Sequence, residues 1–132
     1  MFSKNVKILV IDDMKTMRMV MKKCLKQLGY ENIEEADDGE SAWPLFQQAK
    51  SGGSPFQLIL SDWNMPQMKG IELLEKIRQI DKEVPFVMVT AESEKSQVVE
   101  AIQKGVSHYI TKPFTKDTVE ERLGQVYQKV SG

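Results

Sequence analysis

Short apolar runs alternate along the chain with longer stretches in which apolar residues recur every three or four positions. The runs cover residues 6–11, 33–36, 58–60, 86–89 and 109–111. The first run is apolar except at Lys7, as expected of a strand that is covered on both faces. We therefore predict five strands, each followed by a helix.

The helices are predicted from apolar residues at helical spacing. These are Met17, Val20, Met21, Cys24, Leu25 and Leu28, then Ala42, Leu45, Phe46 and Ala49, then Ile71, Leu74 and Ile77, then Val98, Val99 and Ile102, and finally Val119, Leu123, Val126 and Val130. Five strand–helix units predict an α/β fold, a doubly wound five-stranded parallel sheet with helices on both faces. Right-handed crossovers leave only a few strand orders. We expect one domain spanning residues 1–132.

One residue interrupts the second helical pattern. Pro44 would remove a hydrogen bond from a helix interior and clash with the preceding turn. Ser41 is a good N-cap residue, and a helix capped there would have Pro44 in its first turn, where amide groups are unpaired anyway. We therefore predict a late or irregular start to this helix.

Polar residues follow the apolar runs. Asp12 and Asp13 follow the first, Asp62 the third, Thr90 the fourth, and Lys112 the fifth. Open α/β sheets bind their ligands at the carboxyl ends of the strands, so these side chains are expected to converge. Crowded carboxylates raise one another's pKa unless a cation neutralises them, and oxygen ligands suit Mg²⁺. The set predicts a site for Mg²⁺ and a phosphoryl group.

Other chemistries are disfavoured. A zinc site needs His or Cys ligands, and His108 and Cys24 are too few and poorly placed. The net charge of -1 and pI of about 5.9 provide no general basic field for nucleic acid, and the adjacent Lys22 and Lys23 are interpreted as part of a solvated helix face. No signal-peptide or membrane-spanning stretch is present in this sequence. With Cys24 as the single cysteine no intrachain disulfide can form, and we expect a cytoplasmic protein.

Five ordered motifs now support a resemblance. Asp12-Asp13, the segment 61–66, the segment 70–74, the segment 89–92 and the segment 112–115 match in order and spacing. Over almost its whole length the chain resembles a receiver domain of two-component signalling, most closely the CheY group of chemotaxis response regulators. The resemblance implies a flavodoxin-like sheet with strand order 2-1-3-4-5.

The resemblance also implies roles for the site residues. Asp62 would accept the phosphoryl group from a phosphohistidine of a histidine kinase. Asp13 and Asp62 would bind Mg²⁺ directly, Asp12 through a water, and Asn64 through its carbonyl group. The residues that would contact the phosphoryl group are Lys112, Thr90 and the backbones of Asn64 and Ala91, and Asn64 and Glu92 would flank the hydrolytic water.

Readout of the phosphorylated state is implied in the same way. Thr90 and Tyr109 would form the switch, and the output surface would include Ser93, Lys95, Tyr109, Phe114 and Arg122. Phe114 has two readings, a partner anchor or a partly buried aromatic residue. Departures from the family pattern are Lys69, where an acid is common, His108, where a small residue is common, and the neutral Gln125.

Several functions remain open. The first is a stand-alone, monomeric regulator that binds a flagellar motor switch protein. A phosphatase would be a further partner, and we expect no binding to nucleic acid or membrane. This function is favoured because the sequence ends at the fifth helix. The alternative is a phosphorelay carrier, a phosphate sink or a fragment of a longer regulator.

A magnesium-dependent phosphatase acting on metabolites would commonly have an acid where Asn64 stands, so we expect no enzyme activity beyond self-phosphorylation and autodephosphorylation. A nucleotide-binding site is disfavoured because no Gly-rich loop follows the first strand.

Overall fold

The computed structural model describes residues 2–65, 68–91 and 96–131. Five parallel strands form one sheet in the order β2-β1-β3-β4-β5, so the predicted fold class and strand order are confirmed. The strands are β1 (Ile8–Ile11), β2 (Ile33–Ala36), β3 (Leu58–Asp62), β4 (Phe86–Ala91) and β5 (His108–Lys112).

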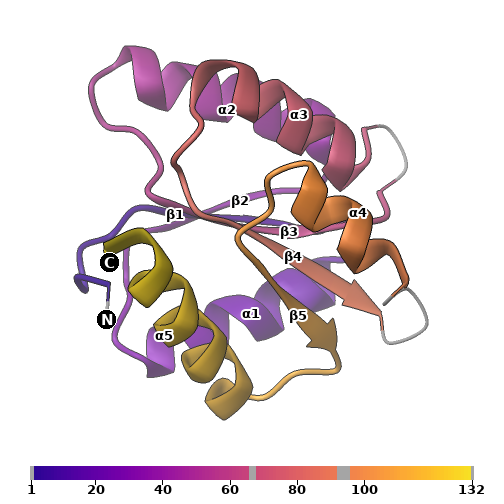
Figure 1. Cartoon of the computed structure of the whole chain (residues 1–132). Helices are drawn as coiled ribbons and strands as arrows, with labels where there is room; N and C mark the ends of the chain where they lie inside the picture. Colours follow the sequence, from indigo (N-terminus) through magenta and orange to yellow (C-terminus); the bar gives the residue numbers. More distant parts are fainter. Residues whose placement is uncertain (1, 66–67, 92–95, 132) are drawn as a thin grey trace.

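Helices cover both faces of this sheet. They are α1 (Lys15–Gln27), α2 (Gly39–Ser51), α3 (Gly70–Ile80), α4 (Val98–Gln103) and α5 (Lys116–Ser131). In Figure 1, α1 and α5 lie below the sheet, and α2, α3 and α4 lie above it. Two buried apolar clusters form the core, one under each helix layer. The central strands β1 and β3 contribute to both clusters, which explains their continuous apolar runs.

Strand register brings the predicted site residues to one edge of the sheet. Ile11 on β1 is opposite Ser61 on β3, and Asp62 is opposite Val89 on β4. Strands β3, β4 and β5 are longer than the apolar runs predicted, because backbone pairing continues through polar residues at their ends. Asp62 and Lys112 are therefore strand residues, held by the sheet itself.

The predicted start of α2 was wrong. Asp38, not Ser41, is the N-cap: its side chain accepts a hydrogen bond from the Ser41 amide at 2.8 Å, and Ser41 makes the reciprocal contact. This capping box satisfies two amide donors and so starts the helix three residues earlier than expected. Pro44 consequently lies within the helix, beyond its first turn.

Three predicted helix faces also needed correction. On α5, Val130 is 48% exposed, although Val119, Leu123 and Val126 are buried as expected. Val20 on α1 is 43% exposed, although Met21, Cys24 and Leu25 are buried as expected. On α4, Val99 is 65% and Ile102 57% exposed. Because α4 has only six residues, it buries a narrow stripe and leaves its other apolar residues exposed.

Within the described ranges, no helix combines the length and apolar character that a bilayer crossing requires.

Candidate functional site

Three carboxylates meet at the carboxyl edge of the sheet. Asp12 and Asp13 follow β1, and Asp62 ends β3. One carboxylate oxygen from each lies within 4.8 Å of the others. Asp12 is 5% and Asp62 7% exposed, whereas Asp13 faces solvent. The structure thus brings together the acidic residues that the sequence predicted.

Lys112 joins this group from the end of β5. Its Nζ lies 2.9 Å from Asp12 Oδ2 and 3.4 Å from Asp62 Oδ1. Because β4 lies between β3 and β5, the long Lys112 side chain must pass the end of β4 to reach Asp62. The peptide bond between Lys112 and Pro113 is cis. One cation among three carboxylates leaves the group with a net negative charge.

The protonation of these groups follows from burial and crowding. Burial raises the pKa of Asp62 to about 6; attraction to Lys112 opposes this rise, and Asp12 and Asp13 add to it. Burial alone would lower the pKa of Lys112, but its hydrogen bond to Asp12 and the nearby carboxylates outweigh that effect and raise it. Lys112 therefore stays charged at neutral pH, and Asp62 ionises at an unusually high pH for a carboxyl group.

Asp12 is fixed by contacts that the sequence did not reveal. Its Oδ1 accepts a hydrogen bond from the Met14 amide at 2.9 Å, and its carbonyl oxygen accepts one from Arg18 Nη1 at 2.6 Å. Arg18 is in turn paired with Glu35 at 3.1 Å. The N-cap residue of α1 is Met14, so Asp13 does not cap this helix and remains available to a ligand. Arg18 is the positioning residue that sequence reasoning missed.

The backbone of Asp62 is confined by close packing. A Cβ on Gly70 would lie 2.7 Å from the Asp62 carbonyl oxygen and 2.9 Å from Trp63 Cε3. The Gly70 amide donates to the Trp63 carbonyl at 3.0 Å, which joins the start of α3 to the end of β3. Trp63 is buried in the core on the α2–α3–α4 side, beside the candidate phosphoacceptor.

Thr90 and Ala91 lie at the end of β4, between the acidic cluster and β5. Thr90 is fully buried, and its hydroxyl donates to the Ala91 carbonyl at 3.4 Å. The register opposes Thr90 to Thr111 and Ala91 to Lys112. The structure therefore brings Thr90, Ala91 and Lys112 to adjacent strand ends.

The remaining predicted residues follow β3 or lie on β5, on α5 and in the segment between them. Asn64 is exposed just after β3. Tyr109 and Arg122 are half-buried beside each other at the β5 edge. Phe114 is half-buried against the core on the α1–α5 side, which favours the reading as a partly buried aromatic residue. Three predicted residues lie outside the described residues: Glu92, Ser93 and Lys95.

The donor set fits Mg²⁺. All the candidate side-chain ligands are carboxylate oxygens, and the exposure of Asp13 leaves one side of the cluster open to water. A bound dication would also relieve the repulsion that raises the pKa of Asp62. Soft-metal coordination is disfavoured because no Cys or His belongs to this cluster in the part of the chain that the structure describes.

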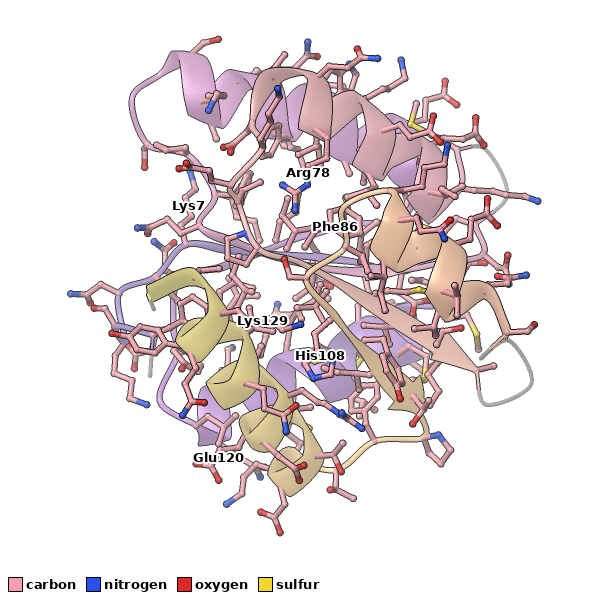
Figure 2. All side chains as sticks on the ribbon, in the orientation of Figure 1. Lys7, Arg78, Phe86, His108, Glu120 and Lys129 are labelled. Carbon is pink, nitrogen blue, oxygen red and sulfur yellow. The ribbon has the colours of Figure 1, made fainter. Side chains whose placement is uncertain are left out.

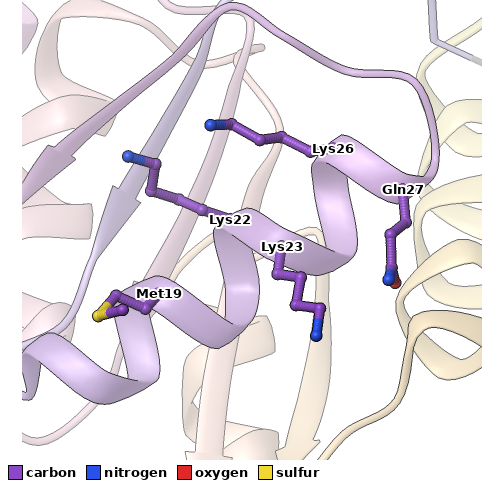
Figure 3. Close-up of a pocket in the computed structure, with 5 residues that line it drawn as sticks. All are labelled: Met19, Lys22, Lys23, Lys26 and Gln27. Atoms are coloured by element: carbon purple, nitrogen blue, oxygen red, sulfur yellow. The ribbon is translucent and has the colours of Figure 1, made fainter.

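A separate open hollow of about 520 Å³ lies along α1. Figure 3 shows its lining residues: Met19, Lys22, Lys23, Lys26 and Gln27. Lys22 and Lys26 extend to one side of the helix and Lys23 to another, and Lys22 is paired with Glu35 at 2.9 Å. This arrangement agrees with the predicted solvated helix face.

Comparison with known proteins identifies the class. Residues 8–124 match the family model described as the response regulator receiver domain, and the chain belongs to this family. It is 43% identical over 130 residues to chemotaxis protein CheY-3 of Vibrio cholerae, covering 97% of this chain and 96% of that protein. It is 41% identical to chemotaxis protein CheY of Pseudomonas aeruginosa, covering 96% of this chain and 100% of that protein.

Solved structures agree on the fold. A response regulator receiver domain protein from Clostridium thermocellum superimposes with a TM-score of 0.81 at 23% identity, covering 96% of this chain and 94% of that chain. The chemotaxis response regulator CheY4 of Vibrio cholerae superimposes with a TM-score of 0.78 at 32% identity, covering 92% and 98% respectively. The protein is thus a CheY-like receiver domain of two-component signalling, a class of signalling proteins rather than conventional enzymes.

Proposed function

We propose that residues 1–132 form one receiver domain that is activated by phosphorylation of Asp62 in the cytoplasm, and that it regulates flagellar rotation in chemotaxis. The observation that carries this proposal is the position of Lys112, whose ammonium group contacts both Asp12 and Asp62 beside a third carboxylate. Phosphoryl transfer depends mainly on alignment and charge neutralisation, and this constellation supplies both. The chemotaxis role is supported by the CheY relatives.

The transfer step uses a phosphohistidine of a histidine kinase as donor. A carboxylate oxygen of Asp62 attacks the phosphorus atom, the P–N bond breaks, and the imidazole leaves with the bonding electron pair. Lys112 stabilises charge on the phosphoryl oxygens, and the Thr90 hydroxyl and Ala91 amide donate hydrogen bonds to them. Hydrolysis of the acyl phosphate by water, beside Asn64, later restores the carboxylate.

Asp12, Asp13, Asp62 and the Asn64 carbonyl would hold Mg²⁺. When bound, the ion neutralises the excess negative charge so that a phosphoryl group can approach. Arg18 and Met14 keep Asp12 oriented toward that position, and Gly70 allows the Asp62 backbone to lie close to α3.

The signal would leave through the surface formed by α4, β5 and α5. Each new charge-assisted hydrogen bond is worth about 1.5–3 kcal/mol, enough to bias a two-state surface. Thr90 would move toward the phosphoryl group and Tyr109 would follow. The exposed Val99 and Ile102 on α4 add apolar area to this surface, as expected for binding a flagellar motor switch protein. A phosphatase would be a further partner, and the receiver itself would act as a monomer.

Phosphorylation with a labelled cognate histidine kinase tests the proposal. Wild-type protein should gain one acid-stable, base-labile phosphoryl group in Mg²⁺ and none in EDTA, and Asp62→Ala should gain none. Asp38→Asn, which retains an N-cap side chain away from the site, serves as the matched control. Normal labelling of Asp62→Ala would refute the proposed acceptor.

The output partner is tested separately, by capture with the beryllofluoride-loaded protein. Enrichment of a motor switch protein is the expected outcome. Enrichment of a histidine phosphotransfer protein instead would refute the motor role and favour a relay carrier.

A further inference from the structure

Four side chains form a contact cluster on the β5 edge: His108, Tyr109, Arg122 and Gln125. Here it is called the His108 cluster. The His108 Nε2 atom hydrogen-bonds to Gln125 Oε1, and Arg122 Nη1 lies 3.4 Å from the same nitrogen. The Arg122 guanidinium also lies over the Tyr109 ring, 5.1 Å from its centroid. In Figure 2, His108 lies between β5 and α5.

Arg122 contacts residues on both faces of the edge strand. Because side chains alternate along a strand, His108 and Ile110 face α5, whereas Tyr109 faces the opposite layer. Tyr109 accordingly packs against the core cluster that contains α4, and Ile110 belongs to the cluster that contains α5. Among the described residues, strand β5 has a neighbouring strand only on its β4 side, so an arginine on α5 can reach around the open edge to the Tyr109 ring.

The hydrogen bonds define a neutral imidazole. The Tyr109 amide donates to His108 Nδ1 at 2.9 Å, so Nδ1 carries no proton. In the neutral ring the proton is then on Nε2, where it is donated to Gln125 Oε1. A second proton on Nδ1 would face the Tyr109 amide hydrogen and break that bond. It would also place a positive ring 3.4 Å from the Arg122 guanidinium.

The charges around His108 favour the neutral form overall. From α5 it faces Arg122, Lys129 and Glu121, and on β4 its register partner is the apolar Val87. Burial lowers the pKa of His108 most. The hydrogen bond to Gln125 and the charge of Glu121 raise it, and Arg122 and Lys129 lower it further, for a net decrease.

We propose that Arg122 is a positioning residue that holds the Tyr109 ring in its half-exposed place while His108 is neutral, and that protonation of His108 releases the ring. The guanidinium attracts the face of the aromatic ring. At exposed sites such a contact favours the contacting ring position over other positions by about two- to five-fold. An imidazolium would repel the guanidinium and so remove this preference. The consequence for signalling, easier rearrangement of Tyr109 at low pH, rests on the proposed function.

The test follows the Tyr109 ring by fluorine NMR with fluorotyrosine, in protein without Mg²⁺ or phosphodonor. Tyr30→Phe and Tyr127→Phe variants assign the resonances. In the wild type, the Tyr109 resonance should titrate with one midpoint below the usual histidine value of about 6.5. In Arg122→Gln, the Tyr109 resonance should stay at every pH near the chemical shift that the wild type reaches at low pH. The fraction of molecules with the ring in its contact position should be about two- to five-fold lower than in the wild type at high pH. Arg122→Lys, which keeps the charge, should restore part of the shift.

His108→Gln should remove the titration and keep the ring in its contact position. Lys116→Gln, an exposed α5 variant outside the cluster, should behave as wild type. An unchanged Tyr109 resonance in Arg122→Gln, or a titration that persists in folded His108→Gln, would overturn the proposal; His108→Asn repeats the test if the first variant is unstable. Because the measurement needs no phosphorylation, an absence of labelling at Asp62 would refute the proposed function while leaving this result intact.

Discussion

The acidic site and the β5 edge both place cations against other polar groups, but they do so in opposite ways. At the site, Lys112 lies between buried carboxylates, so attraction dominates and the contacts are short. At the edge, Arg122 lies beside a neutral imidazole and an aromatic ring, both half-exposed. The comparison teaches that burial with opposite charge gives a firm arrangement, whereas a neutral titratable neighbour gives one that a single proton can change.

Removing the site cation should have the largest effect. Lys112→Met leaves the buried Asp12 and Asp62 without the lysine cation, and the free energy of unfolding should fall by about 3–5 kcal/mol at pH 8. At pH 5 the loss should be smaller because Asp62 then binds a proton. Urea unfolding at both pH values measures this, with Lys116→Met as the control. An equal loss at both pH values would contradict the crowding argument.

Removing a site anion should have the opposite sign. The folded-state pKa of Asp62, about 6, exceeds its unfolded value of 3.8, so the native state binds more protons between these values. This group's contribution to stability therefore falls as pH rises through that window. Without Mg²⁺, Asp62→Asn should raise the free energy of unfolding by about 1–3 kcal/mol at pH 7. Asp38→Asn, the control, should change the free energy of unfolding little. A lower free energy of unfolding in Asp62→Asn would contradict the raised pKa of Asp62.

Proton competition should weaken Mg²⁺ binding. Since the ion requires ionised Asp62, its apparent affinity should fall about ten-fold between pH 7 and pH 5. Emission from Trp63, which adjoins Asp62 in the core, is the readout, with Trp43→Phe removing the second indole signal. An Mg²⁺ affinity that does not change with pH, or a Trp63 emission that does not change with Mg²⁺, would show that Asp62 is not the titrating ligand.

The smallest effect on stability is expected at the β5 edge. Arg122→Met should change the free energy of unfolding by less than about 0.5 kcal/mol, because its contacts are half-exposed. The same variant should still shift the Tyr109 resonance. A large stability loss measured by urea unfolding would mean that Arg122 is a structural residue like Lys112, and the contrast between the two regions would disappear.

Sequence patterning predicted the architecture well where one interaction dominates. The continuous apolar runs of β1 and β3 reflect burial under both helix layers. The polar residues at the ends of β1, β3 and β5 identified Asp12, Asp62 and Lys112 as neighbours. Patterning was less reliable at helix surfaces. Val99 and Ile102 repeat at helical spacing but are exposed, because apolar spacing alone cannot show how wide a stripe the sheet covers.

Local competition between signals explains the error in α2. Ser41 was predicted as the N-cap because a helix that begins there has Pro44 in its first turn. The reciprocal contacts between Asp38 and Ser41 start the helix earlier, and Pro44 is accommodated inside it. Arg18 was missed because its acceptor, the Asp12 carbonyl, is a backbone atom that carries no sequence signal.

The order of apolar runs and the residues that end them determined a receiver-type sheet with an acidic edge, since burial and strand pairing act on residue type and spacing. Tertiary structure alone decided how tightly Lys112 approaches the carboxylates, which amide and guanidinium groups hold Asp12, and that Arg122 reaches around β5 to Tyr109. Those contacts join side chains and backbone atoms from different elements, and their distances depend on how the helices pack against the sheet.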